Sequence, residues 1–387
     1  MHIKSLSIQN LRGHKNLAMT FCPGINAIVG INGVGKSTIL DAISYSLSHF
    51  VAKLKRKTGT GKVMPDSNIT IGKQEASISS SYEVEAGNSI NLFLAVTRIG
   101  RTKANDNMMK DVTAWAATYH QMRLDNQPVS YPILAHYKVN RAILDIPQRQ
   151  PRLKDLEEPL SGYHAALDGG GNFRGFFAWF REMEDLEKEN RDELQNPLYR
   201  EPELEAVRLA LRKIIPGITN IRIRRKHQAM MATKNGVEIT INQLSDGEKC
   251  YLALIGDIAC RLARLNTLTA KTTEEILSSE GIVLIDELEL HLHPKWQREA
   301  IRHLQSIFPR IQFIITTHSL MLLRELEIMR LEQRPCENIK YFSLSEGEGN
   351  SILLKDSESL DKLESLAASA LQLEQDTQLL RCYGYDL

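Results

Sequence analysis

The chain has 387 residues, of which 42% are apolar, and its 48 basic and 47 acidic residues give a formal net charge of +1. This length exceeds what one ordinary hydrophobic core accommodates. The balanced charge gives no argument for nucleic acid or an acidic membrane surface as a partner of the whole chain. The five cysteines form no C-x-x-C pair, and no run approaches the roughly 18 uninterrupted apolar residues of a membrane span. These features predict a cytoplasmic globular protein without membrane contact.

The first informative stretch is a phosphate-binding loop between a strand and a helix. Apolar residues alternate with polar ones over residues 3–8, and a buried run covers residues 25–29. Residues 30–38 then match G-x-x-x-x-G-K-[ST], and apolar residues at helical spacing follow. A glycine-rich turn before an ordinary helix is the alternative interpretation, but it does not account for all the fixed positions together.

The residue types of this loop suit binding of ATP with Mg²⁺. Glycines let backbone N–H groups point at phosphates, and the following helix adds the positive end of its dipole. Lys36 is predicted to reach the β and γ phosphates, and the Ser37 hydroxyl to hold the Mg²⁺ ion. The predicted nucleotide-binding residues of the loop are Asn32, Gly33, Gly35, Lys36, Ser37 and Thr38.

The middle of the chain mixes strand and helix patterns. Residues 69–82 and 90–97 alternate apolar and polar residues, which indicates antiparallel strands laid on the core. Residues 133–137 form a short buried strand, and residues 173–215 are helical, with an aromatic patch that is typical of a core. Residues 221–224 alternate as a strand with a basic outer face, which leaves a contact with DNA or RNA open.

A second phosphate-facing helix end is predicted at residues 244–249. Ser245 and Glu248 have the spacing of a capping box, and an amphipathic helix follows. Gly247 weakens a helix, which a mere cap does not require, and a small residue there lets a phosphate approach the helix end. We therefore add Ser245, Gly247 and Glu248 to the nucleotide-binding residues. If each of two subunits supplies one helix end, ATP lies between them in a twofold dimer.

Two further buried strands end in catalytic side chains. Residues 281–285 run into Asp286, predicted to hold Mg²⁺, and Glu287, predicted to be the general base for the attacking water. Residues 311–317 lead to His318, which is placed to contact the γ-phosphate. Parallel strands meet at one carboxyl edge, so these groups are expected beside the phosphate loop. His291 and His293 have the wrong spacing for a metal-binding helical pair.

These motifs in this order resemble the ABC-type ATPases, and most closely the stand-alone RecF-like and OLD-like bacterial ATPases, including the PtuA-like ATPases of Septu and retron antiphage systems. The resemblance implies that Ser245 contacts the γ-phosphate of the opposite subunit's ATP and that Arg12 leans over the nucleotide. The signature reads LSDGE rather than LSGGQ, and the usual Q-loop glutamine is not evident. Asn140 or Gln148 is the candidate replacement.

The expected fold class is α/β, with a P-loop ABC-ATPase core built on a mostly parallel sheet, an antiparallel β insertion and a helical lobe. We expect the core at residues 1–50, 131–150 and 216–345, the β-rich insertion at 51–130, the helical region at 151–215 and a C-terminal helical tail at 346–387.

The resemblance implies an ATP-hydrolysing regulator that assembles as a homodimer or higher homo-oligomer and controls a separate nuclease, of HNH type, in antiphage defence. The chain itself shows neither an HNH motif nor room for a Toprim domain after His318. One alternative is a DNA repair or recombination ATPase acting directly on DNA. Another is a transporter subunit, which the large insertion and the signature disfavour.

Overall fold

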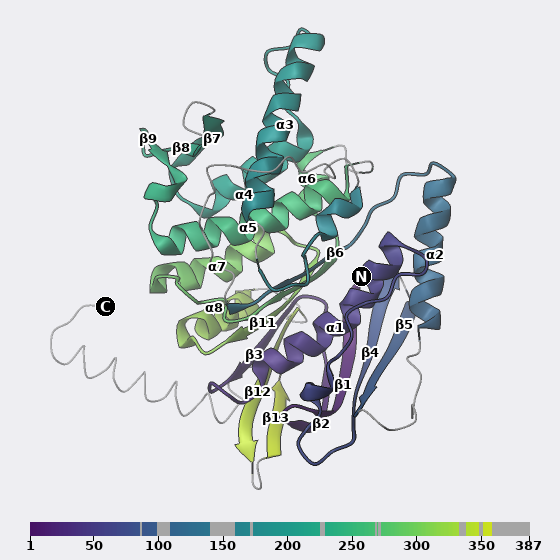
Figure 1. The fold of residues 1–387 in the computed structure, drawn as a ribbon. Helices are drawn as coiled ribbons and strands as arrows, with labels where there is room; N and C mark the ends of the chain where they lie inside the picture. The colour runs from purple at the N-terminus through teal and green to yellow at the C-terminus, as the bar shows by residue number, and fades with distance from the viewer. Residues whose placement is uncertain are drawn as a thin grey trace, which may run out of the picture.

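The computed structural model describes residues 1–85, 87–98, 109–139, 159–170, 173–224, 229–267, 269, 272–332, 338–347 and 351–357 (Figure 1). Within these ranges no helix is long and apolar enough to cross a membrane. The candidate Q-loop residues Asn140 and Gln148 lie outside the described residues, as does the chain from 358 onward.

A six-stranded sheet forms the centre of the molecule, in the order β13-β12-β3-β11-β10-β6. The five adjacent strands β12, β3, β11, β10 and β6 run parallel to one another, and the edge strand β13 is antiparallel to β12. Every residue of β6, β10 and β11 is buried, as the continuous apolar runs predicted. The strand bounds are β3 Ile25–Gly30, β6 Ile133–Tyr137, β10 Gly281–Ile285, β11 Ile311–Thr317, β12 Ile339–Gly347 and β13 Ser351–Ser357.

A second sheet is antiparallel, in the order β2-β1-β4-β5. The two strands expected in the insertion are β4 and β5, and β4 pairs directly with β1, so they extend the N-terminal hairpin. The buried Gln312 of β11 links the two sheets, because its side-chain amide exchanges hydrogen bonds of 2.8 and 2.9 Å with the backbone of Ile3. The bounds are β1 His2–Leu11, β2 His14–Thr20, β4 Glu75–Glu85 and β5 Asn88–Thr97.

Helix α1 (Lys36–Lys55) lies between these two sheets. It contacts β1 and β4 on one side and β3, β6, β10 and β11 on the other. Apolar residues such as Ile39, Ile43 and Leu47 are fully buried, so the helix that begins at the phosphate loop is the core of the molecule. Helix α2 (Lys110–Leu124) covers the outer end of α1 and β5.

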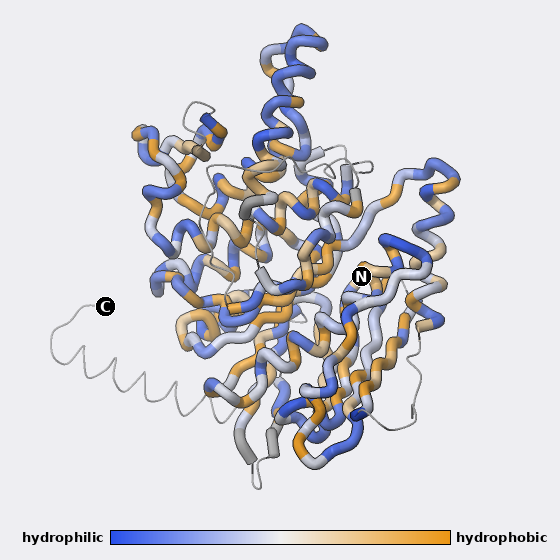
Figure 2. The backbone as a smooth tube through the Cα atoms, viewed as in Figure 1, coloured by the Kyte–Doolittle hydropathy of each residue, from blue (hydrophilic) through white to orange (hydrophobic). Residues whose placement is uncertain are grey.

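The other helices form a lobe on the opposite face of the parallel sheet (Figure 1). Helices α4 and α5 pack on each other, while α3 projects from the lobe with a largely hydrophilic tip (Figure 2). A small antiparallel sheet, β7-β8-β9, closes the lobe before α5. The bounds are α3 Phe173–Glu193, α4 Pro202–Ile214, α5 Asp246–Leu265, α6 Thr273–Leu277, α7 Pro294–Ile307, α8 Leu320–Glu332, β7 Ile218–Arg224, β8 Ala229–Lys234 and β9 Val237–Thr240.

One part of the expected C-terminal helical tail has a different structure. Residues Ser351–Ser357 form β13, which pairs with β12 over its whole length. The hairpin with β12 supplies the partner that a lone strand needs, so this segment takes the strand conformation. The helical expectation for this short range is therefore corrected.

A buried polar network joins the parallel sheet to α5. The Tyr137 hydroxyl at the end of β6 donates to Asp257 over 2.7 Å, and the Arg261 Nε donates to the same carboxylate over 2.8 Å. Arg261 also donates to the carbonyls of Gly162 and His164. Because each charge is paired and hydrogen-bonded, this network is tolerated in the core and fixes α5 against β6.

The core helix α1 also carries a buried histidine that makes stability depend on pH. Burial, with the Lys53 ammonium nearby, lowers the pKa of His49 to about 4 from its ordinary 6.5. Between these values the unfolded chain binds a proton that the folded chain does not. We therefore expect full stability above pH 6.5 and a loss of up to about 3 kcal/mol from this residue as pH falls through the window to 4.

Urea unfolding of the wild type and of His49→Gln at several pH values between 7 and 4 checks this expectation. The free energy of unfolding of the variant should depend less on pH. The matched control is His164→Gln, which removes an exposed histidine and should keep the wild-type profile. Parallel wild-type and His49→Gln profiles would contradict the assignment.

Candidate nucleotide site

The phosphate loop lies between β3 and α1, as predicted. Gly33 and Gly35 have backbone φ values of 89° and 94°, which residues other than glycine rarely adopt. Asn32, Gly33 and Ser37 are exposed, and Thr38 is buried, with its N–H bonded to the Gly35 carbonyl. The loop therefore presents its backbone and the Ser37 hydroxyl outward at the positive end of α1.

The Lys36 ammonium is folded into the loop. Its Nζ donates to the carbonyls of Gly30 and Ile31 over 2.6 and 3.0 Å, and only 6% of the residue is exposed. Burial lowers the pKa of Lys36, while the nearby carboxylates of Glu287, Asp286 and Glu289 oppose that shift. The geometry thus places the lysine charge close to both the loop and the acidic strand end.

His14, which the sequence analysis did not select, contacts the backbone of the phosphate loop. Its Nε2 lies 3.0 Å from the Gly35 carbonyl oxygen, so this nitrogen carries the proton and donates it. A Cβ on Gly35 would lie 2.5 Å from the same nitrogen, so both the backbone angle and the space require glycine. In the sequence, the only indication of this role is that His14 lies two residues after Arg12. Its hydrogen-bond partner, the Gly35 carbonyl, is 21 residues away and is evident only from the structure.

The two carboxylates after β10 are positioned by a threonine of β11. Thr316 Oγ1 donates to Asp286 Oδ1 over 2.5 Å and accepts from the Glu287 N–H over 2.8 Å. The Asp286 N–H in turn donates to the Tyr137 carbonyl. Glu287 has φ 47°, a left-handed backbone value that is uncommon for a residue other than glycine, at the point where the strand ends. The buried Asp286 and half-buried Glu287 thus follow the strand as predicted, and Thr316 holds both.

His318 is oriented by a carboxylate that the sequence analysis missed. Its Nδ1 lies 3.0 Å from Glu289 Oε1, and its backbone N–H donates to the same oxygen over 2.7 Å. Glu289 is buried, whereas the imidazole is 51% exposed. A proton on Nδ1 is held by Glu289, which leaves Nε2 to face solvent at the carboxyl edge of β11.

The signature segment forms the predicted capping box. The Ser245 hydroxyl accepts from the Glu248 N–H over 3.3 Å, and the Glu248 carboxylate accepts from the Ser245 N–H over 3.1 Å. Glu248 also pairs with Lys234 at 2.6 Å. Ser245 is exposed, while Glu248 is occupied at the cap, and their contacts with nucleotide stay predictions.

Gly247 has a packing role in addition to the predicted one. A Cβ at this position would lie 2.6 Å from the His291 carbonyl oxygen, so the first turn of α5 packs directly on the loop that follows Asp286 and Glu287. His293 caps α7, because its Nδ1 accepts a hydrogen bond from the Lys295 N–H over 3.3 Å.

The fold thus brings three of the four predicted groups to one edge. β3, β10 and β11 are neighbouring parallel strands, so the loop, Asp286 with Glu287, and His318 follow their carboxyl ends. Ser245 begins a helix of the other lobe, beside the loop that leads to α7. Arg12 lies in the β1–β2 turn and pairs with Asp41 of α1 at 2.8 Å.

The residues at this edge suit Mg²⁺. The ion prefers hard oxygen ligands and keeps several waters and substrate phosphates, so one hydroxyl from Ser37 and one carboxylate from Asp286 suffice on the protein side. Among the described residues no group of three or more His, Cys, Asp or Glu could hold a metal by itself.

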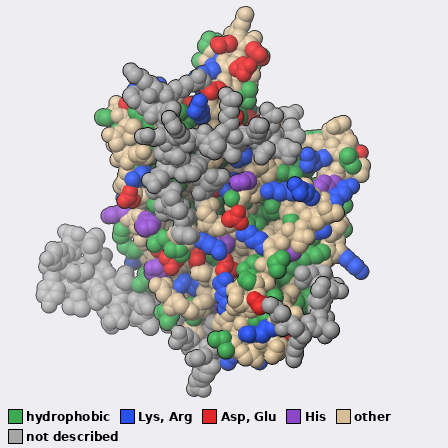
Figure 3. Space-filling view, in the orientation of Figure 1, with side chains coloured by type: hydrophobic (Ala, Val, Ile, Leu, Met, Phe, Trp, Pro, Cys, Tyr) green, Lys and Arg blue, Asp and Glu red, His purple; other side chains and the backbone are tan. Residues whose placement is uncertain are grey.

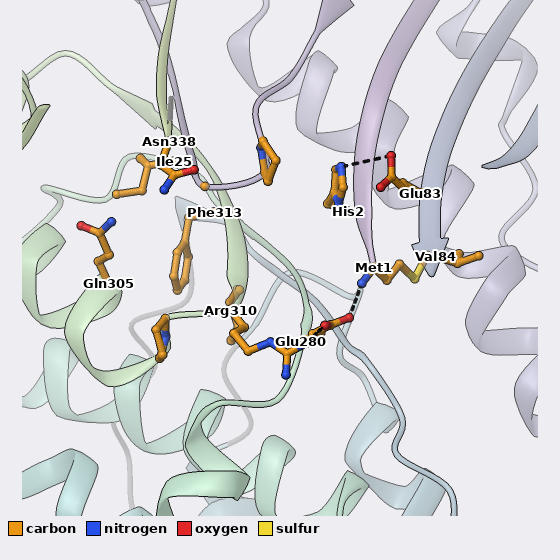
Figure 4. Close-up of a pocket in the computed structure, with 14 residues that line it drawn as sticks. Met1, His2, Ile25, Glu83, Val84, Glu280, Gln305, Arg310, Phe313 and Asn338 are labelled. Carbon is orange, nitrogen blue, oxygen red and sulfur yellow. Dashed lines mark hydrogen bonds and ion pairs between the residues drawn. The ribbon is translucent and has the colours of Figure 1, made fainter. Parts of the chain in front are cut away.

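A hollow of about 300 Å³ lies elsewhere, at the amino ends of β3, β10 and β11 (Figure 4). It is lined by Glu280, Arg310 and Phe313, among others, and the Met1 amine bonds to Glu280 there. Ligands of open α/β sheets bind at the carboxyl ends of the strands, so this hollow is separate from the phosphate loop.

The fold matches solved structures of ABC-type ATPase heads. The crystal structure of an Smc head bound to the C-winged helix domain of ScpA aligns with 94% of this chain and 99% of that chain, with a TM-score of 0.55 and 17% identity. At this identity the match shows the fold alone. It therefore defines the fold as that of an ABC-type ATPase head, in which the phosphate loop and the acidic strand end occupy neighbouring strand ends.

The particular family follows from sequence comparison. A family model described as "AAA domain" matches residues 5–215, and a second AAA-domain model matches residues 124–324. The chain is 31% identical to the "Retron Ec83 probable ATPase" of Escherichia coli over 82% of this chain and 69% of that protein. The "Septu protein PtuA" of Bacillus thuringiensis is 26% identical over 82% of this chain and 72% of that protein. The chain therefore belongs to the AAA-domain ATPase family, among relatives of antiphage systems.

The position of Thr316 predicts a strong effect of a nearly isosteric substitution. Thr316→Val removes the hydroxyl that holds Asp286 and the Glu287 N–H, so kcat for ATP should fall about 10- to 100-fold and more Mg²⁺ should be needed for half-maximal activity. Steady-state phosphate release at varied Mg²⁺ measures both quantities.

Thr316→Ser is the matched control, because it keeps the hydroxyl and should keep most of the activity. Equal kcat values in the Val variant and the wild type would show that Asp286 and Glu287 do not depend on this threonine.

Proposed function

We propose that this ATPase is a regulator that assembles through ATP-sandwich dimers and controls a partner nuclease, of HNH type, in antiphage defence. The observation that carries the proposal is the separation of two exposed phosphate-facing helix ends. The loop before α1 exposes Asn32, Gly33 and Ser37, and the start of α5 exposes Ser245 on the other lobe. A second copy related by a twofold axis brings one of each together around ATP.

The roles of the residues follow from where they lie. Lys36 and the loop backbone bind the phosphates, and Ser37 and Asp286 would hold Mg²⁺, which neutralises phosphate charge when bound. Glu287 orients and deprotonates the attacking water, and His318, fixed by Glu289, faces the γ-phosphate. Ser245 of the partner completes the site, so hydrolysis requires assembly.

The similarity to proteins named as retron and Septu components supports the defence context. A separate nuclease subunit is the element that this proposal adds.

Direct contact with DNA or RNA is the second candidate, and one feature favours it. A groove of about 630 Å³ between α3, α4 and β7 is lined by basic side chains, including Arg200, Arg222 and Arg224. Acidic partners offset many of them, since Arg222 and Arg224 share Glu238. Over the face in Figure 3, basic and acidic side chains are likewise interspersed. The regulator therefore remains the leading proposal.

Catalysis across two subunits makes a prediction for paired variants. Lys36→Ala should lose both ATP binding and hydrolysis, whereas Glu287→Gln should bind ATP, hydrolyse about 100-fold more slowly and accumulate as a trapped dimer. Ser245→Arg, which fills the space before α5, should be inactive alone. A 1:1 mixture of Lys36→Ala and Ser245→Arg should recover up to about a quarter of wild-type activity, because half the dimers carry one intact site of two.

Phosphate release and native mass spectrometry measure these outcomes. A 1:1 mixture of the Lys36→Ala protein and the Glu287→Gln protein serves as the control. Lys36 and Glu287 of one subunit belong to the same ATP site, so a mixed dimer has one substitution in each of its two sites and neither site is intact. No recovery in the Ser245→Arg mixture would contradict the sandwich arrangement.

The partner is tested by affinity capture of the tagged chain expressed with its genomic neighbours, in the presence of ATP. We expect a stoichiometric nuclease and a native mass of a defined oligomer. The Lys36→Ala chain is the control for dependence on nucleotide. A chain that emerges alone and binds DNA in an ATP-dependent way would replace the regulator with the DNA-acting alternative.

A further inference from the structure

A three-residue ionic clamp lies beside the nucleotide edge. Asp41, on the second turn of α1, accepts Arg12 on Oδ2 at 2.8 Å and pairs through Oδ1 with the Lys138 ammonium at 2.9 Å. Only 14% of the Asp41 side chain is exposed, compared with 38% for Arg12 and 43% for Lys138. One carboxylate therefore ties the β1–β2 turn and the end of β6 to the helix of the phosphate loop.

Each end of the clamp is itself held. Arg12 has φ 50°, its N–H donates to the Asn68 carbonyl over 2.7 Å, and its Nε donates to the Asn68 side chain over 3.1 Å. The Lys138 N–H donates to the Gly169 carbonyl over 2.7 Å. A Cβ on Gly169 would lie 2.6 Å from Cγ and Cδ of Lys138, so the lysine stem lies directly over a glycine. These contacts make the ion pairs part of a fixed arrangement.

The clamp connects the two protein groups that suit Mg²⁺. Ser37 lies four residues before Asp41 on α1. Lys138 follows Tyr137, which is paired with Ile285 in the sheet register, so Lys138 lies beside Asp286 at the next strand end. The Asp286 N–H also donates to the Tyr137 carbonyl over 2.8 Å. A shift of β6 relative to α1 would therefore separate Asp286 from Ser37.

The charges agree with this arrangement. Burial would raise the pKa of Asp41, but the Lys138 ammonium and the Arg12 guanidinium hold it below its ordinary value. The carboxylate thus stays ionised and both pairs persist at neutral pH. The groove of basic residues on the helical lobe is a weaker candidate for a further role, because shared glutamates neutralise it.

We propose that Lys138 is a positioning residue of the ATPase reaction, which acts through Asp41 to keep Asp286 aligned with Ser37. This inference rests on the ATPase activity of the proposed function and does not depend on the nuclease partner. Lys138 also begins the segment that leads from β6 to the helical lobe. The clamp thus connects the residue that follows β6 directly with the phosphate-loop helix.

The test measures kcat, the KM for ATP and the Mg²⁺ concentration for half-maximal activity in Lys138→Met, Lys138→Arg, Asp41→Asn and the Lys138→Met/Asp41→Asn double variant. We expect Lys138→Met to lower kcat about 10-fold and to raise the Mg²⁺ requirement, with nucleotide binding in EDTA unchanged. Lys138→Arg should recover the activity. The double variant should be no worse than Asp41→Asn, because both changes break one connection.

The matched control is Lys62→Met, which removes a nearby lysine of similar exposure that pairs with Asp168 and does not contact α1 carboxylates. It should leave kcat and the Mg²⁺ requirement unchanged. Additive losses in the double variant, or a Lys138→Met enzyme with wild-type kcat and Mg²⁺ dependence, would overturn the inference. If Lys138→Met fails to fold, Asp41→Asn carries the same test. A wild-type chain that fails to hydrolyse ATP would instead overturn the proposed function.

Discussion

The structure depends on the burial of α1 between two sheets. A helix that starts at a phosphate loop and is packed on both sides cannot tilt without disturbing the parallel sheet or the antiparallel one. The loop before it therefore has a fixed place relative to β10 and β11, whose ends carry the acidic and histidine side chains. The geometry of the proposed site follows from this packing, because the predicted phosphate-binding groups and the predicted water-activating groups come from distant parts of the chain.

Around that core, short polar connections set the positions of the groups that we predict to be catalytic. Thr316 fixes the carboxylates after β10, Glu289 fixes His318, and His14 fixes the backbone of the phosphate loop. None of the three contacts substrate in the proposed mechanism. Each restricts the motion of a side chain or loop through a hydrogen bond. The site therefore loses less conformational entropy when ATP binds.

Much of this could be predicted from the sequence because local patterns carry it. The loop motif, the apolar runs into Asp286 and His318, and the capping box of Ser245 each specify both a local structure and a role. Thr316, Glu289 and Asp41 were missed because their importance arises from partners about 30 residues away in the chain. The strand β13 was missed because its partner strand, rather than its own propensity, decides its conformation.

The close packing of Gly247 on the His291 carbonyl has a consequence for communication between active sites. In the proposed dimer, the segment from Glu287 to His291 would serve one nucleotide, and the start of α5 that rests on it would serve the nucleotide bound by the neighbouring subunit. A displacement of either is passed to the other, since no side chain at position 247 cushions the contact. In such an assembly, nucleotide bound at one site would influence the geometry of the other site, while one complete site would still hydrolyse ATP.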